Sequence, residues 1–177
     1  MDRNWQNLTD PIMRWAAERP NAIALVEGQR SLSYGDLGAL MRRATVFLRR
    51  NGVAPGARAG IAMVNGIDHA ILLLAMMRMG AVPVELPTGS GAAPILAAVG
   101  KYRLAAVVTD PDIDLGAGTE TIHIRIHLDT RAGIADLPPD EGAAFGLDAL
   151  TIVVLSSGTT GVPAGFVSTH RQMLCCI

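Results

Sequence analysis

The chain has 177 residues, of which 50% are hydrophobic and 18% charged, and its net charge is −1. Such a charge leaves no basic surface for nucleic acid or an anionic membrane, and an aromatic content of 4% argues against a base-stacking platform. Because charged residues usually make up about 25% of a globular domain, the composition fits either a deeply buried α/β sheet or a piece whose missing remainder covers apolar surface.

The N-terminal residues predict a short helix followed by a β-hairpin. Thr9 or Asp10 can cap the helix, and Pro11 suits its first turn because an amide hydrogen there has no helical partner. Residues 21–26 and 30–32 predict two strands joined by a glycine-containing turn. We therefore expect the fold to open with an amphipathic helix and an antiparallel pair of strands.

A longer helix follows the hairpin and is the best-defined element of the sequence. Ser33 is a suitable N-cap, Asp36 stands three residues later in the capping-box position, and Gly52 ends the helix. Apolar residues recur between them at helical spacing: Leu37, Leu40, Met41, Ala44, Phe47 and Leu48. The arginines at 42, 43, 49 and 50 lie largely off this stripe, which predicts a solvated opposite face.

Strands and helices alternate in the next part of the chain. Continuous apolar runs predict strands at 59–64, 82–86 and 105–109, and helices are predicted at 67–79 and 92–102. This rhythm is typical of a parallel sheet covered on both faces and joined by right-handed crossovers. The predicted fold class is therefore α/β, with a mostly parallel sheet flanked by helices.

A strand near the edge of the sheet is predicted at 121–128, where every second residue is apolar. His123 and His127 share its solvated face at a separation of about 13 Å by strand rise, too far apart to bind one metal ion. No metal site is predicted. Residues 129–148 contain prolines and glycines, which predict a long surface connection.

Few features of the sequence indicate where in the cell the protein resides. The N-terminus lacks the apolar core of a secretory signal, and the most apolar run, residues 70–77, is too short to cross a bilayer. Cys175 and Cys176 are adjacent, which suits neither a structural disulfide nor a pair of metal ligands. We therefore expect a cytoplasmic protein with no membrane span and with unreactive cysteines.

Residues 151–170 carry the strongest chemical signal. Residues 151–155 and 166–168 predict strands, and the segment between them is rich in hydroxyl groups and glycine: Ser156, Ser157, Gly158, Thr159, Thr160 and Gly161. Glycine lets the main chain approach a ligand, and exposed N–H groups and hydroxyls form an anion-binding concavity suited to polyphosphate. The segment lacks the lysine and the helix of a mononucleotide P-loop. From composition alone, a surface turn is an equal alternative.

The same segment resembles part of a known family. The sequence SSGTTGVPAG, followed by Val167, Thr169 and His170, resembles the signature phosphate loop of the adenylate-forming superfamily. That superfamily includes acyl-CoA synthetases, fatty-acyl-AMP ligases, luciferases and the adenylation domains of peptide synthetases. Three upstream segments resemble further family patterns in the same order: residues 31–37, 52–63 and 75–83. The resemblance therefore covers nearly the whole chain.

Three positions depart from the family pattern. Ala164 stands where the family has a loop lysine, which removes a cation near the phosphates. Arg58 replaces a residue that is usually acidic, and residues 87–91 replace an asparagine–proline turn. These departures bear on nucleotide affinity more than on the fold.

The resemblance implies an ATP-dependent ligase that uses Mg²⁺ and ATP to activate a carboxylic acid and then passes the acyl group to a thiol, usually of coenzyme A. By residue-wise transfer, residues 156–161 and Gly165 bind the nucleotide, with Thr159 and Thr160 as the principal hydroxyl donors. Residues 1–177 then form a partial N-terminal adenylation domain, truncated after the phosphate loop. We expect no catalytic residue within it and no activity in isolation.

The alternatives differ in the role of the parent protein. The leading expectation is an acyl-CoA synthetase of fatty acid metabolism, and the second is a domain that loads a carrier-protein thiol. The third is a catalytically dead remnant acting as an interaction module, which Ala164 and the early end of the chain favour. Exposed apolar surface would favour a homo-oligomer. The sequence does not identify the acid.

Overall fold

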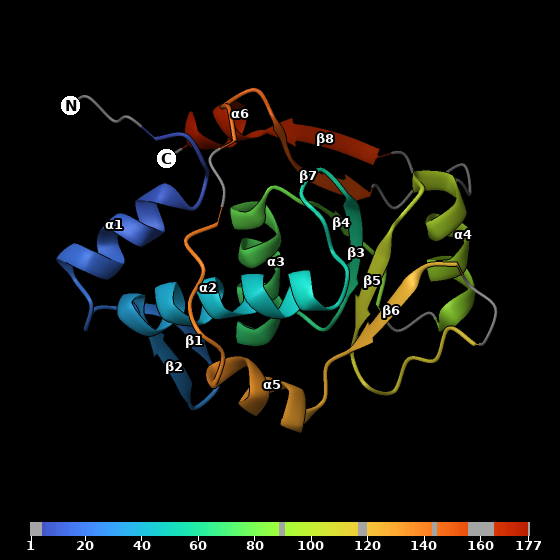
Figure 1. Ribbon diagram of the computed structural model, residues 1–177, viewed down its shortest axis with the longest axis horizontal. Coiled ribbons are helices and arrows are strands. Elements are labelled where there is room, and N and C mark those ends of the chain that lie inside the picture. Colours follow the sequence, from blue (N-terminus) through green and yellow to red (C-terminus); the bar gives the residue numbers. More distant parts are fainter. Residues whose placement is uncertain (1–4, 89–90, 117–119, 143–144, 156–164, 177) are drawn as a thin grey trace.

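A six-stranded sheet with helices on both faces forms the centre of the molecule (Figure 1). The computed structural model describes residues 5–88, 91–116, 120–142, 145–155 and 165–176. The strand order is β6-β5-β3-β4-β7-β8, and all neighbours are parallel except β7 and β8. The strands are β3 (Arg58–Ala62), β4 (Val82–Glu85), β5 (Ala106–Thr109), β6 (Ile122–Arg125), β7 (Leu150–Leu155) and β8 (Gly165–Thr169). The predicted fold class is confirmed, and β6 lies at an edge as predicted.

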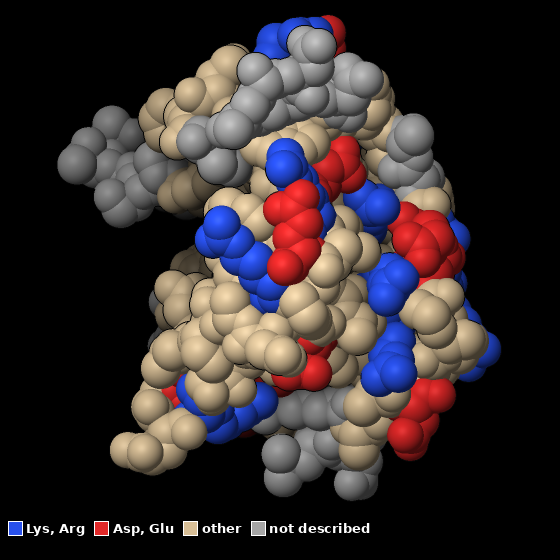
Figure 2. Space-filling view, turned by 90° about the vertical axis from the view of Figure 1, so that its left-hand side faces the viewer, with Lys and Arg blue, Asp and Glu red and all other residues tan. Residues whose placement is uncertain are grey.

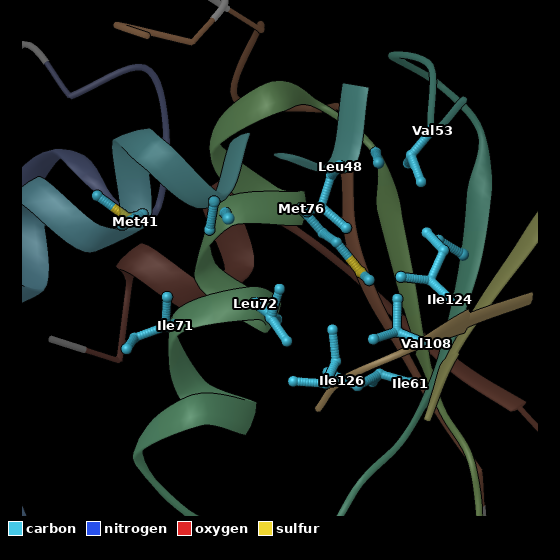
Figure 3. Packing of buried hydrophobic residues seen from close by; sticks show 14 of the residues in the cluster. Met41, Leu48, Val53, Ile61, Ile71, Leu72, Met76, Val108, Ile124 and Ile126 are labelled. Atoms are coloured by element: carbon cyan, nitrogen blue, oxygen red, sulfur yellow. The ribbon is translucent and has the colours of Figure 1, made fainter. Parts of the chain in front are cut away.

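Two helices at the predicted positions cover opposite faces of the sheet. α3 (Ile67–Met79) packs against β3 and β5 in the cluster shown in Figure 3, which contains Ile61 and Val108. α4 (Ala92–Tyr102) packs on the other face, in a cluster that contains Val84 and Val107. Successive strand residues point to opposite faces, so adjacent valines of β5 belong to different clusters. Each helix therefore seals one face of the same strands.

Four elements precede the sheet and agree with the sequence patterns: α1 (Asp10–Glu18), β1 (Ile23–Glu27), β2 (Arg30–Ser33) and α2 (Tyr34–Arg50). β1 and β2 form a separate antiparallel pair. The Ser33 hydroxyl caps α2 by accepting a hydrogen bond from the Asp36 N–H at 3.1 Å. Met41 and Leu48, on the apolar stripe of α2, are fully buried, and α2 packs against α3.

One segment predicted to be a surface connection contains a helix. β6 ends at Arg125, before the predicted strand end at residue 128, and α5 (Leu128–Ala135) follows it. Ile126 and Ile134 are both buried in the cluster on the α3 side of the sheet. A helix this short is not stable in isolation, so its packing decides its structure. The prediction for residues 129–148 was therefore wrong in its first part.

Ion pairs fasten the segment after α5 to α2, and a hydrogen bond fastens it to α3. Asp140 pairs with Arg49, and Glu141 pairs with Arg42 at 2.8 Å. The Arg78 Nε–H donates to the Glu141 carbonyl at 2.9 Å. Two of the arginines predicted to lie on a solvated face of α2 therefore hold a connecting segment. On the face shown in Figure 2, acidic and basic side chains are interspersed rather than gathered by sign.

Candidate functional site

The carboxyl ends of the parallel strands meet at one edge of the sheet, and the predicted phosphate loop follows one of them. β3 and β4 are neighbours, yet the chain leaves β3 toward α3 on one face and β4 toward α4 on the other. Such a switch point opens a crevice outside the strand ends, where α/β proteins bind ligands. This edge is the candidate site.

A hollow of about 740 Å³ lies at this edge. Its walls come from residues that follow β3, β4 and β5, among them Val64, Pro87, Thr88, Asp110, Asp112 and Asp114. The Asp110 carboxylate accepts a hydrogen bond from the Val64 N–H at 2.8 Å, which joins the ends of β5 and β3. Carboxylates repel phosphates. If a phosphate binds at this edge, the groups that donate hydrogen bonds to it must therefore come from residues other than these aspartates.

Two further contacts fix the strand ends on the α3 side. The Glu27 carboxylate, from the β1–β2 hairpin, accepts a hydrogen bond from the Ile67 N–H at 3.1 Å and so caps α3. His69 Nε2 lies 3.1 Å from Glu85 Oε2, with both side chains largely buried, which links α3 to the end of β4. The end of β4 is therefore tied to α3.

The predicted phosphate-contacting residues, 156–161, lie outside the described residues, as does Ala164. β7 and β8 lie on either side of these residues, where the sequence predicts two strands, and the structure shows that they form an antiparallel pair up to Leu155 and Gly165. β7 also pairs in parallel with β4, with Glu85 opposite Val154. The strand that leads into the predicted loop therefore ends beside β4, at the same edge as the hollow.

Gly165 is the member of the predicted set that the structure places. A Cβ atom at this position would lie 3.1 Å from Val153 Cγ1 and 3.3 Å from Tyr102 Cε1. These contacts are tight enough that the neighbours would have to move, so close packing of β8 against Tyr102 and Val153 accounts for a glycine here. Its contact with phosphate stays a prediction.

His170 fastens the base of the β7–β8 hairpin to the N-terminal segment. It is 1% exposed, and its Nδ1 accepts a hydrogen bond from the Leu8 N–H at 3.1 Å. Burial lowers the pKa of His170, although the nearby Asp10 carboxylate acts in the opposite direction. The imidazole is therefore neutral near pH 7 and keeps a lone pair for this bond. Thr169 and Gln172 form a capping box at the start of α6 (His170–Leu174).

The histidines of the β6 region do not form a metal site. His123 is half-buried rather than solvated, with its Nε2 2.9 Å from Thr109 Oγ1, and burial, reinforced by Arg125, lowers its pKa. His127 lies beyond the end of β6. Within the described ranges, no group of three His, Cys, Asp or Glu side chains could hold a metal ion. Cys175 and Cys176 are free thiols at the surface.

No helix in the described part of the chain is both long enough and apolar enough to span a membrane.

Three polar residues of the candidate site carry no sequence motif. Asp110 could have been found, because a carboxylate directly after a buried parallel strand falls at the ligand-binding edge. His69 and Glu85 could not, because they belong to different elements and only the packing of α3 against β4 brings them together. The His69–Glu85 contact is therefore a finding of the structure.

Comparison with known proteins adds relatives of known activity. The AMP-binding enzyme family matches residues 12–177. The 4-chlorobenzoate–CoA ligase of Arthrobacter sp is 31% identical over 179 residues, covering 92% of this chain and 33% of the ligase. A linear gramicidin synthase of Brevibacillus parabrevis is 29% identical, covering 90% of this chain and 2% of that protein. The chain thus spans a third or less of the length of these relatives.

Solved structures agree with the fold. The N-terminal domain of FACL13 from Mycobacterium tuberculosis, in an inhibitor-bound crystal structure, matches with a TM-score of 0.81 at 24% identity, covering 94% of this chain and 45% of that one. VinN matches with a TM-score of 0.83 at 19% identity, covering 94% of this chain and 44% of that one. At these identities the likeness shows the fold alone.

Proposed function

Because the chain belongs to the AMP-binding enzyme family, we propose that it forms the N-terminal part of an ATP-dependent ligase that activates a carboxylic acid. The observation that carries the proposal is the position of β7. This strand lies within the family match of residues 12–177 and ends beside β4 at the switch-point edge of the parallel sheet, and in the sequence a segment rich in hydroxyls and glycines follows it.

The proposed role of residues 156–161 is to hold the β- and γ-phosphates of ATP. Their hydroxyls and N–H groups are donors, which fits phosphate oxygens, whereas the carboxylates of Asp110 and Asp112 in the wall of the hollow offer only acceptors. Held phosphates align the pyrophosphate leaving group and stabilise its charge as a carboxylate attacks the α-phosphate. Thr159 and Thr160 are the proposed principal hydroxyl donors.

Mg²⁺ would accompany ATP in this proposal. The phosphates would supply much of its coordination, as is usual for this ion.

The second substrate is proposed to be the thiol of coenzyme A. A relative at 31% identity is a 4-chlorobenzoate–CoA ligase, which favours this acceptor. The gramicidin synthase relative, at 29% identity, favours a carrier-protein thiol as the second candidate. We propose that the parent ligase joins an acyl group to this thiol in the cytoplasm. Fatty acid metabolism is one setting for the reaction.

The 177-residue chain alone is proposed to lack adenylation activity. It spans 33% of the length of the 4-chlorobenzoate–CoA ligase, so we infer that the residues for acyl transfer lie in the other part of such a ligase. Purified chain should show no ATP–pyrophosphate exchange above background with a panel of carboxylic acids. Exchange that depends on an added acid would overturn this inference.

Pyrophosphate binding tests the phosphate-gripping role directly. Titration calorimetry with magnesium pyrophosphate should show binding by the unaltered chain that a Thr159→Ala/Thr160→Ala double variant weakens by about tenfold or more, since hydrogen bonds to charged groups contribute about 1.5–3 kcal/mol. Ser31→Ala, on exposed β2, is the matched control and should leave binding unchanged. Equal affinity in all three proteins would contradict the proposed role.

A further inference from the structure

A cavity of about 170 Å³ lies on the α3 side of the sheet, apart from the candidate site. Its walls come from β2, α2, α3, α5 and the residue that follows β6, and these elements lie together in Figure 1. Most of its described lining residues are leucine or isoleucine, among them Leu40 of α2, Ile71 and Leu72 of α3, and Ile134 of α5. It shares no described lining residue with the hollow at the candidate site, so it is a separate space.

The apolar part of the cavity lies inside the protein. Ile71, Ile126 and Ile134 line it, and their exposed fractions are 6%, 1% and 6%. Protein interiors are close-packed and leave few voids larger than a water molecule. Water does not fill an apolar void, because it needs about two to four polar partners, whereas apolar cavities of about 150 Å³ stay dry and bind benzene. Size and lining therefore fit an apolar ligand about as large as a benzene ring.

The mouth of the cavity is charged. Arg30 and Asp68 line it, and the Arg30 side chain is 57% exposed, which places this end at the surface. Arg30 Nη1 lies 3.4 Å from the carboxylates of both Asp68 and Glu27. Two carboxylates repel an anionic ligand. A hydroxyl group, by contrast, can accept a hydrogen bond from the guanidinium and donate one to a carboxylate. The mouth therefore favours an uncharged ligand that carries a hydroxyl.

We propose that this cavity binds a small phenol, with its ring among the aliphatic side chains and its hydroxyl at Arg30 and Asp68. The inference does not rest on the proposed function, because it uses none of the residues of the candidate site. The ligand also differs from the carboxylic acid that the parent ligase is proposed to activate, whose carboxylate would meet those of Glu27 and Asp68. Since the walls come from this chain, the 177-residue protein itself should bind the ligand.

Titration calorimetry with phenol and benzoate tests the ligand class. Phenol should bind the unaltered chain with a dissociation constant of roughly 0.1–1 mM, which lies within the ceiling on affinity for a ligand of this size. Benzoate has the same ring with a carboxylate and should bind about tenfold more weakly or worse, because the mouth repels an anion. Asp68→Asn removes one carboxylate, so it should narrow this difference by about threefold or more while phenol still binds.

A matched pair of substitutions tests the location. Leu40→Phe adds bulk to the wall of the cavity and should weaken phenol binding by about tenfold or more, because a filled cavity has no room for the ring. Leu96→Phe is the control: Leu96 is also a partly buried leucine of a helix, but it packs in the cluster on the α4 face of the sheet. This variant should bind phenol as the unaltered chain does. Circular dichroism shows whether each variant is folded.

Nuclear Overhauser contacts in the unaltered chain locate the ring without any variant. Phenol ring protons should contact the methyl groups of Ile71 and Ile134, and not those of Ile113, which lines the hollow at the candidate site. The proposal is overturned if the chain binds no phenol at about 10 mM, tenfold above the weak end of the expected range. It is equally overturned if folded Leu40→Phe binds phenol as tightly, if benzoate binds as well as phenol, or if the ring contacts Ile113 alone.

Discussion

The α2–α3 side of the sheet and the β7–β8 hairpin differ in how their apolar residues are used. On the first side, Leu48, Ile61 and Met76 are fully buried and interlock as Figure 3 shows. In the hairpin, Val154 and Phe166 are as apolar but about half exposed or more. The first region holds the fold together, whereas the second positions a loop and leaves its surface open for contacts. Stability and the proposed chemistry therefore reside in different parts of one sheet.

A matched pair of truncations should give the largest difference between the regions. Met76→Ala removes a fully buried side chain from the centre of α3 and should lower the free energy of unfolding by about 2–5 kcal/mol. Phe166→Ala removes a larger but exposed side chain and should change it by no more than about 0.5 kcal/mol. Urea unfolding followed by circular dichroism measures both. Equal losses would mean that the hairpin is part of the core.

The turn between α3 and β4 should be the next most sensitive position. Gly80 has φ +78°, and a Cβ atom there would lie 1.9 Å from Phe145 Cζ. Gly80→Ala should therefore cost about 1–3 kcal/mol from crowding, with further strain from the positive φ. Gly100→Ala is the control: Gly100 is an exposed residue of α4 with nothing within 4 Å of an added Cβ, and the substitution should stabilise by about 0.5–1 kcal/mol. A tolerated Gly80→Ala in thermal unfolding would show that Phe145 does not pack firmly there.

Helix caps provide a smaller contrast between the regions. Ser33→Ala removes the cap of α2 and should cost about 1 kcal/mol of global stability. Thr169→Ala removes the capping box of α6, a helix of five residues at the base of the hairpin, and should cost less because such an end opens without global unfolding. Hydrogen exchange should show faster exchange confined to α6 in the second variant. If Thr169→Ala instead lowered the global free energy of unfolding, the contrast between the core and the hairpin would be contradicted.

Local sequence signals predicted the elements of this fold well, and tertiary packing accounts for what they missed. The Ser33 cap and the apolar stripe of α2 are local, as are the bounds 67–79 and 92–102, which the structure reproduces. α5 was missed because Ile134 becomes apolar core only through packing against other elements. In the candidate site, the strands before and after the loop were predictable from their β-branched residues. The His69–Glu85 contact was not, because it depends on how α3 lies against β4. The loop contacts of residues 156–161 stay predictions.

Acid pH should produce the smallest effect, and it acts at the base of the hairpin. Burial lowers the pKa of His170 in the folded chain, so the unfolded chain binds its proton more readily. The stability that this residue contributes is thus complete above the ordinary pKa of about 6.5 and is lost as the pH falls below that value toward the folded pKa. His123, whose pKa burial also lowers, contributes with the same sign.

His170→Asn isolates this contribution, because the asparagine carbonyl can still accept the Leu8 N–H but does not titrate. Between pH 7.5 and 5.5 the unaltered chain should lose more free energy of unfolding than the variant. Among the large, fully buried side chains of the described residues, His170 is the one that ionises in this range. Identical pH profiles for the two proteins would show that the N-terminal segment is not held through a neutral imidazole. A variant that loses more than the unaltered chain would reverse the sign of the effect.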